Sequence, residues 1–331
     1  MTNARFARSV AVTLLIGTTA VLGISESGAS SGPGSAAQVA RVVASSLSIT
    51  TLPSNLSPSL ANASKDLATV GTPSLARCNT TGETLNPAKC VFGDTKGSKT
   101  MVLWGDSHAF MWFPAVNAVA KKNHWKLVTL LEYACPPADV SVWDPVTSSP
   151  YTSCNVFRRN MIAAINKLNP SLVIISEMFV SQAADAGGAF NTISPARWQA
   201  GLERTLRSLR SRRMHKVLIG NTVYTLNRSD AIPPQCLAAN LTSIQKCTIR
   251  DSATLQAQRA AESRAAKAEK TGYINVLPWL CSSKTKLASC SAIVGDATVG
   301  YGIVYYSTGH LTQRYDLWLS TVLGTALKPS L

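Results

Sequence analysis

The residues best suited to chemistry form a polar break in the apolar stretch MVLWGDSHAFMW, residues 101–112. Asp106, Ser107 and His108 stand where a strand-like run gives way to a helix-like one. The N–H groups at the start of a helix would stabilise an oxygen that develops negative charge nearby. Ser107 is therefore placed as a nucleophile, while the alternative is a plain helix cap made by Asp106 or Ser107.

A nucleophilic serine needs a general base, which a histidine usually supplies. The chain contains four histidines, His108, His124, His215 and His310. The first adjoins the serine and is expected to point elsewhere, and the next two lie at a helix end and before a strand. His310 lies in YYSTGHLTQRY, between the strand-like residues 298–306 and the last helix. It is the candidate base for Ser107.

Strand-like and helix-like runs alternate along the chain. Strands are expected near 100–104, 125–131, 171–176, 216–220 and 273–277, and helices near 110–120, 157–168, 198–209, 251–270 and 312–327. This alternation predicts a doubly wound α/β domain with a parallel sheet covered on both faces. Ligands of such sheets bind beyond the carboxyl ends of the strands, which is where Ser107 is expected.

The amino-terminal residues indicate export. Arg5 and Arg8 precede an uncharged run at 9–24, shorter than the roughly 20 residues that span a bilayer. We interpret residues 1–29 as a signal peptide, with Ser27-Gly28-Ala29 as the candidate cleavage site, or as a transmembrane helix that anchors the protein. Residues 30–76, rich in Ser and Pro, are expected to be a linker and a wrapping segment, followed by one domain at 77–331.

Eight cysteines fall into four close pairs along the chain, which favours nearest-neighbour disulfides and an extracytoplasmic location. The expected pairs are Cys78–Cys90, Cys135–Cys154, Cys236–Cys247 and Cys281–Cys290. No C-x-x-C pair indicates a zinc site, and neither a metal nor another cofactor is expected.

The net charge is +15, while 46% of the residues are hydrophobic and supply a large core. Such a charge favours anionic partners, among them a membrane surface, wall polymers and nucleic acid. An exported protein is not expected to meet nucleic acid, so an anionic membrane surface and anionic wall polymers remain as expected partners, and charge alone does not choose between them.

GDSHA at 105–109, together with HLT at 310–312, resembles the SGNH hydrolase superfamily, specifically the SGNH domain fused to bacterial acyltransferase-3 membrane proteins. Supporting motifs are LPSNLSPSLANASKDL at 52–67, ACPP at 134–137, VLIGNT at 217–222, PPQC at 233–236 and PWLC at 278–281. The resemblance implies a three-layer α/β/α sandwich with a mainly parallel, flavodoxin-like sheet. It also implies acyl transfer to or from cell-surface glycans, with Ser107 as the nucleophile.

The chain departs from this family at three positions. Ser307 stands three residues before His310, where the family usually has an aspartate. Asn221 occupies the aspartate position of a strand motif resembling G-D-T-P, and residues 176–179 lack the asparagine that many SGNH enzymes carry after the third strand. Asn221 is the remaining candidate for an oxyanion donor, and Asp106 and Ser307 are candidate supporting residues.

Two functions follow from this pattern. The first is a Ser107–His310 dyad esterase or O-acyltransferase that acts on acyl esters, in particular acetyl esters, of a cell-surface polysaccharide or peptidoglycan. A backbone carbonyl or a carboxylate such as Asp296 would then replace the missing acid, and a separate membrane acyltransferase is a candidate partner that supplies the acyl group. The alternative is a catalytically degenerate domain that binds wall glycan or a partner protein.

Overall fold

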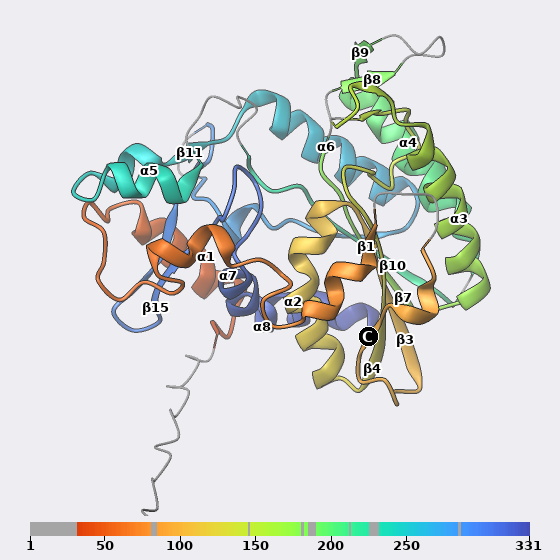
Figure 1. The fold of residues 1–331 in the computed structure, drawn as a ribbon, viewed down its shortest axis with the longest axis horizontal. Coiled ribbons are helices and arrows are strands. Elements are labelled where there is room, and N and C mark those ends of the chain that lie inside the picture. The colour runs from red at the N-terminus through yellow and green to blue at the C-terminus, as the bar shows by residue number, and fades with distance from the viewer. Residues whose placement is uncertain are drawn as a thin grey trace, which may run out of the picture. The chain divides into compact units, whose positions relative to one another are not determined.

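A mainly parallel sheet forms the centre of the protein, as the alternation of elements predicted. The computed structural model describes residues 32–80, 85–144, 146–179, 182–184, 190–211, 213–224, 232–283 and 286–331. Within these residues the strand order is β1-β4-β3-β7-β10-β12, all parallel, and β2 adds to β4 in the antiparallel sense (Figure 1). The strands are β1 Asn79–Thr80, β2 Val91–Gly93, β3 Lys99–Gly105, β4 Trp125–Glu132, β7 Leu172–Ser176, β10 His215–Ile219 and β12 Gly272–Ile274.

Helices cover both faces of the sheet, so the three-layer α/β/α architecture is confirmed (Figure 1). Along β3, Met101 and Leu103 join one hydrophobic cluster, while Val102 and Trp104 join another on the opposite face. This alternation is the period of a strand that is buried on both sides. The first face packs α2 Ser107–Lys122, α7 Gln313–Trp318 and α8 Ser320–Leu327; the second packs α3 Thr152–Leu168, α4 Pro195–Ser208 and α6 Ala253–Ala268.

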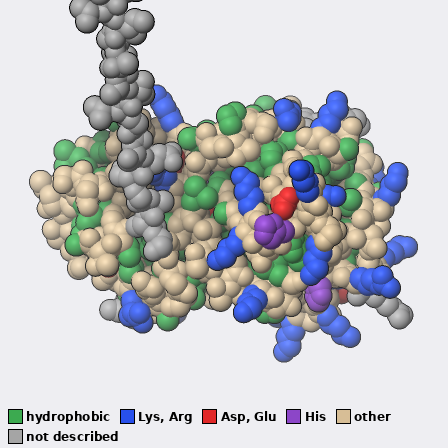
Figure 2. Space-filling view, turned by 90° about the horizontal axis from the view of Figure 1, so that it is seen from below, with side chains coloured by type: hydrophobic (Ala, Val, Ile, Leu, Met, Phe, Trp, Pro, Cys, Tyr) green, Lys and Arg blue, Asp and Glu red, His purple; other side chains and the backbone are tan. Residues whose placement is uncertain are grey.

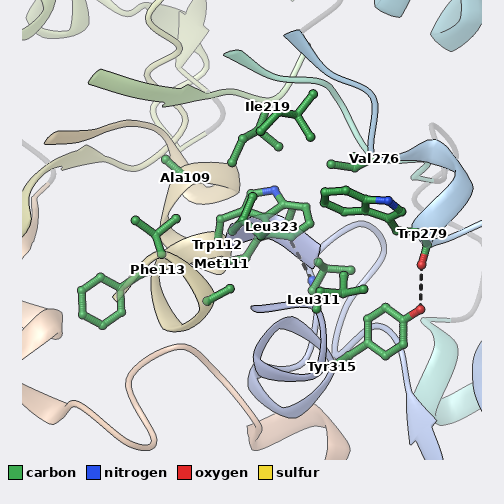
Figure 3. Close-up of a cluster of buried hydrophobic side chains, with 14 of the residues drawn as sticks. Ala109, Met111, Trp112, Phe113, Ile219, Val276, Trp279, Leu311, Tyr315 and Leu323 are labelled. Carbon is green, nitrogen blue, oxygen red and sulfur yellow. Dashed lines mark hydrogen bonds between the residues drawn. The ribbon is translucent and has the colours of Figure 1, made fainter. Parts of the chain in front are cut away.

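The core on the α2 face fixes the chain on either side of the candidate site residues. Figure 3 shows Met111 and Trp112 of α2 packed with Leu311, Leu323 and neighbouring apolar side chains. The backbone N–H of Leu311 also donates to the sulfur of Met111 at 3.4 Å. Because Leu311 directly follows His310, this packing holds the histidine loop against the helix that begins at Ser107.

Residues 30–76, expected to be a linker and a wrapping segment, include a helix. Residues 36–46, which we expected in this linker, form α1 Ala36–Ser46, and the side chains of Val39 and Val43 are fully buried. The spacing of Val39, Val42 and Val43 is helical, but the surrounding Ala and Ser residues obscured it in the sequence. The helix packs against the hairpin of β14 Ile293–Asp296 and β15 Gly300–Ile303.

Smaller elements complete the described fold. Paired short strands are β5 Trp143–Asp144 with β6 Ser149–Pro150, β8 Gln182–Ala184 with β9 Phe190–Thr192, and β11 Ile249–Arg250 with β13 Ser289–Cys290. The remaining helix is α5 Pro233–Ala239, and short 3-10 helices are η1 Leu60–Lys65, η2 Pro73–Cys78, η3 Pro87–Lys89, η4 Ile244–Cys247, η5 Leu277–Trp279 and η6 Lys328–Ser330.

Three expected elements differ in extent from those observed. The strand expected at 273–277 ends at Ile274, because the chain turns into η5, which has a proline in its first turn. The helix expected at 312–327 divides at Leu319 into α7 and α8. The strand-like residues 298–306 form β15 in an antiparallel hairpin rather than a strand of the central sheet.

The interpretation of residues 1–29 as a signal peptide or anchor lies outside the described residues. Within the described part of the chain, no helix has both the length and the apolar composition needed to cross a membrane.

The four predicted cysteine pairs are all disulfides in the structure: Cys78–Cys90, Cys135–Cys154, Cys236–Cys247 and Cys281–Cys290. They join residues 12, 19, 11 and 9 positions apart, so each closes a short local loop.

We expect each bridge to stabilise the protein by about 2 to 4 kcal/mol, mainly by restricting the unfolded chain. Replacing both Cys135 and Cys154 by serine should therefore lower the melting temperature clearly in a thermal unfolding experiment. Peptide mapping without reductant should recover the same four pairs from the unmodified protein. Alkylation of all eight thiols before reduction would contradict this pairing.

Candidate active site

Ser107 lies at a tight turn between β3 and α2, where the sequence placed it. At Gly105 an added Cβ would lie 1.8 Å from the carbonyl oxygen of Ser176 on the neighbouring strand, so only glycine allows this close approach. Ser107 is the first residue of α2, and the earliest bond of the helix runs from the N–H of Phe110 to the carbonyl of Asp106, 3.0 Å. The N–H of Ser107 therefore precedes the helical ladder and points out of the helix end.

Asp106 is the helix cap and also joins two strands. One carboxylate oxygen accepts the N–H of His108 at 2.8 Å, and the other accepts the N–H of Met178, just beyond β7, at 2.8 Å. Burial raises the pKa of this carboxyl to about 7, against the lowering effect of these bonds. Asp106 thus has a supporting role, and because it performs the capping, the hydroxyl of Ser107 is left for another partner.

That partner is His310. The Nε2 atom of His310 lies 2.8 Å from the Oγ atom of Ser107. The loop that carries His310 is closed by a bond from the N–H of Tyr306 to the carbonyl of His310, 3.0 Å, and Tyr306 stacks on the imidazole with ring centroids 5.5 Å apart. Ser107 and His310, which are 203 positions apart in sequence, therefore lie within hydrogen-bond distance, as the sequence predicted.

Ser307 occupies the position of the missing acid. Its Oγ atom lies 2.8 Å from the Nδ1 atom of His310. When Nδ1–H donates to this hydroxyl, Nε2 is left as the acceptor that faces Ser107. Asp296, the carboxylate considered as a substitute, instead accepts the N–H groups of Thr298 and Val299 within its own hairpin turn.

Burial determines the basicity of His310. The ring lies deep in the loop, and burial lowers its pKa to about 4, with no carboxylate raising it. The hydroxyl of Ser307 can orient the ring, but it carries no charge that would stabilise an imidazolium. The dyad is therefore correctly arranged and has a weak base.

Asn221, the expected oxyanion donor, is engaged elsewhere. Its amide nitrogen donates to the carboxylate of Glu262, and its Oδ1 atom accepts the N–H of Phe179 at 3.4 Å. The N–H of Asn221 also donates to Glu262, at 3.0 Å. Asn221 lies just after β10, two strands away from β3, where its side chain meets α6 instead of Ser107. In this arrangement the side chain of Asn221 joins the end of β10 to α6, and its oxyanion role stays a prediction.

Sequence reasoning missed the buried carboxylates near this edge of the sheet. Burial raises the pKa of Glu262 to about 7 and that of Glu177 well above its usual range. Glu177 accepts the N–H of Ala138 at 2.7 Å and so holds the loop after the ACPP motif. Neither carboxylate contacts His310. No sequence pattern marked Glu262 as important, because it lies within an Ala-rich helix. Glu177 lies in the segment 176–179, which was considered only because it lacks the asparagine of many SGNH enzymes.

His108 was expected to point away from the site, yet its ring lies beside His310. The ring centroids are 5.2 Å apart in an edge-to-face arrangement, and a second edge-to-face contact joins His108 to Tyr224 at 6.0 Å. Burial lowers the pKa of His108 well below its usual value, which keeps the ring neutral. His108 therefore packs against the catalytic candidate without adding charge. Within the described residues, no group of three or more His, Cys, Asp or Glu side chains is arranged to hold a metal ion.

Comparison with known proteins identifies the family of this chain. The family model described as "SGNH domain (fused to AT3 domains)" matches residues 77–324. The periplasmic domain of a lipopolysaccharide acetyltransferase from Salmonella ser. Paratyphi A is similar in structure, with a TM-score of 0.56 and 15% identity over 82% of this chain and 97% of that one. At this identity the likeness concerns the fold.

Two further solved structures are more distant. TesA gives a TM-score of 0.39 at 14% identity, over 70% of this chain and 100% of that one. A lipase/acylhydrolase from Enterococcus faecalis gives 0.37 at 10% identity, over 70% and 96%. A search of curated proteins found no match.

Proposed function

The chain belongs to the family of SGNH domains that are fused to AT3 domains, and on this premise we propose that it is an extracytoplasmic serine esterase or O-acyltransferase. Its substrates are acyl esters, in particular acetyl esters, of cell-envelope glycans. The observation that carries the proposal is the 2.8 Å contact between Ser107 Oγ and His310 Nε2 at the start of a helix. Four disulfides support a location in an oxidising compartment.

The reaction proceeds in two steps that use the same groups. The Oγ atom of Ser107 attacks the acyl carbonyl carbon, and its proton passes to Nε2 of His310. The N–H of Ser107 stabilises the oxyanion, the ester C–O bond breaks, and the leaving sugar oxygen takes the proton from Nε2. Water or a second sugar hydroxyl then attacks the acyl-serine and gives its proton to Nε2. The bond between the acyl carbon and Oγ breaks, Oγ of Ser107 takes the proton back from Nε2, and the acid or the new ester leaves.

Aromatic side chains at the same edge of the sheet support a glycan as substrate. Tyr133 directly follows β4, and its side chain is 45% exposed. In the register of the sheet Leu131 is paired with Gly105, so Tyr133 and Ser107 each follow this last pair by two residues at the same edge. Tyr306 stacks on His310 and is half-buried. The faces of aromatic rings attract C–H groups, which cover the apolar faces of sugar rings. The similar Salmonella domain belongs to a lipopolysaccharide acetyltransferase, which supports an acetylated glycan in the same way.

A second candidate function rests on Ser307. Without a carboxylate at Nδ1, the domain would bind acylated glycan or a partner protein and not turn it over. The intact dyad favours the enzyme, and a slow one, because its imidazolium lacks a counter-charge. A membrane acyltransferase that supplies the acyl group is compatible with either function.

The pH dependence of ester hydrolysis tests the proposal. His310 accepts a proton only when it is neutral, and its pKa is lowered to about 4 by burial. We therefore expect kcat/KM for p-nitrophenyl acetate to rise with pH through a midpoint near 4 and to stay level through neutral pH. A midpoint near 6.5 would contradict the buried, uncompensated base, and the absence of hydrolysis above the buffer rate would favour the binding function.

A further inference from the structure

Basic side chains collect at the edge of the sheet opposite to Ser107. All parallel strands begin at this edge, and the helices that return between them end there, so the starts of β3, β4, β10 and β12 lie near the carboxyl ends of α2, α3, α4 and α6. We call this surface the basic face. It comprises Lys96, Lys99, Lys121, Lys122, Lys126, Lys167, Arg210, Arg213, Lys267, Lys270 and Lys328, which are exposed except for the half-buried Lys126. Figure 2 shows Lys and Arg side chains gathered over this side of the molecule.

Contacts within the structure place these residues at one edge. Asn166 of α3 bonds the backbone on both sides of the end of α4, through the carbonyl of Ser208 and the N–H of Arg210, at 2.9 and 3.0 Å. The backbone of Ser171, before β7, bonds Thr100 at the start of β3 and His215 at the start of β10, both at 2.9 Å. The basic face is therefore continuous across the ends of several elements.

Little negative charge compensates this face. Among the described residues, the acidic side chains at this edge are Asp94 and Glu269. Asp94 lies 3.1 Å from His124, and Glu269 is paired with Arg207. Asp94 also accepts the N–H of Lys96 at 3.0 Å. Two carboxylates thus stand against eleven basic side chains on this face.

Helix capping accounts for only part of the face. Five of these residues lie in the last turns of helices, where a cation interacts favourably with the helix dipole: Lys121, Lys122, Lys167, Lys267 and Lys328. Lys99 donates to the carbonyl of Leu331, at the end of η6, at 3.2 Å. Lys96, however, lies before β3, where no helix ends. The charge at this edge exceeds what the helix ends require, which indicates an anionic partner.

We propose that the basic face docks on an anionic lipid bilayer. The cations are spread over the ends of strands and helices instead of lining one groove, which suits an extended surface of negative charge. They are mainly lysines, whose flexible point charges suit mobile headgroups, whereas arginine suits fixed bidentate recognition. Each basic residue near such a surface increases binding by a factor of about 5 at low salt.

A groove within the basic face is suited to a lipid headgroup. It lies between α2 and α8, has a volume of about 590 Å³, and is lined by Lys122, Lys328, Asn123, Thr321 and Thr325 among others. Two ammonium groups and several neutral hydrogen-bonding groups offer the contacts that a phosphate requires.

Docking in this way would orient the molecule. Ser107 lies at the carboxyl end of β3 and the basic face at its amino end, so the site would point away from the bilayer. This orientation rests on the proposed function of Ser107, while the docking itself does not. The site would then face the envelope glycans instead of the lipid.

Amine footprinting on the full-length protein tests the docking. The protein would be acetylated with an amine reagent in the presence of phosphatidylcholine vesicles or of vesicles containing phosphatidylglycerol, and modified lysines would be quantified by mass spectrometry. We expect anionic vesicles at low salt to protect Lys96, Lys121 and Lys122 several-fold, and Lys246 and Lys286 not at all. Both sets of lysines belong to the same protein molecule, so their relative protection can be compared whether or not residues 1–29 also contact the bilayer.

Matched charge-removal variants provide the second measurement. Replacing Lys121, Lys122 and Lys126 by glutamine should lower binding to anionic vesicles by about 10-fold to 100-fold, and should remove part of its salt dependence. The control is Lys246→Gln, Arg250→Gln and Lys286→Gln together, near η4, β11 and the start of α6. It removes the same charge at a distance from the basic face and should bind like the unmodified protein.

Three results would overturn the docking. Equal protection by neutral and anionic vesicles would show that charge does not determine the contact. Equal weakening by both triple variants would show that net charge, and not the basic face, attracts the bilayer. Protection of the same lysines by soluble polyphosphate but not by anionic vesicles would assign the face to an anionic wall polymer instead.

Discussion

Ser307→Asp should increase esterase activity by about 10² to 10⁴. Ser307 Oγ lies 2.8 Å from Nδ1 of His310, so a carboxylate at this position would reach the same ring nitrogen. It would fix the tautomer and stabilise the imidazolium that forms as Ser107 loses its proton. The measurement is kcat/KM for p-nitrophenyl acetate, compared at the same pH for both proteins.

The pH profile distinguishes this mechanism from a general change in packing. A nearby carboxylate raises the pKa of a histidine, so the midpoint near pH 4 should move upward in Ser307→Asp. Ser307→Asn is the matched control, because an amide has a similar size and accepts a bond from Nδ1–H but carries no charge. If Ser307→Asp folds normally but is no faster than Ser307→Asn, the missing acid is not the main defect, and the binding function would be favoured.

Ser107→Ala should remove hydrolysis above the buffer rate, and His310→Ala should be similarly damaging. The hydroxyl is the only group in the proposal that forms the bond to the acyl carbon, and His310 Nε2 is its hydrogen-bond partner at 2.8 Å. Because the two residues act as one unit, the double variant should be no slower than either single variant. Steady-state rates of the three variants on p-nitrophenyl acetate measure this.

Thr308→Ala is the control for the loss of a hydroxyl from the same loop. Thr308 lies between Ser307 and His310, is half-buried, and has no role in the proposed reaction. We expect its activity to stay close to that of the unmodified protein. Wild-type activity in Ser107→Ala would instead exclude this serine as the nucleophile.

Much of the fold could be predicted because each central strand is a short apolar run. Every residue of β7 is buried, as are the last five residues of β3. A strand that is buried on both faces is apolar at every position, so it stands out in the sequence as a continuous apolar run. The helix α1 was missed because its apolar stripe is short and lies in a Ser- and Ala-rich region. Packing against β14 decides its structure, and this contact joins residues about 250 positions apart.

Some residues of the candidate site could likewise be predicted from the sequence, and others could not. Ser107 and His310 could be paired from the sequence because each lies at the boundary between two elements at the same edge of the sheet. Asn221 also lies at a strand end, but its role depends on Glu262, a residue of α6 that approaches from outside the sheet. The position of His108 beside His310 likewise depends on how α2 is rotated, and short-range sequence patterns do not report it.

The central claim is that Ser107 is an activated nucleophile, and covalent labelling with a fluorophosphonate tests it most directly. The purified protein would be incubated with the reagent at neutral pH, digested, and mapped by mass spectrometry, with Ser107→Ala treated in parallel. We predict one adduct, on Ser107, which is absent from Ser107→Ala and forms faster in Ser307→Asp. An unlabelled Ser107 in both the unmodified protein and Ser307→Asp, or an adduct on a different serine, would contradict the account.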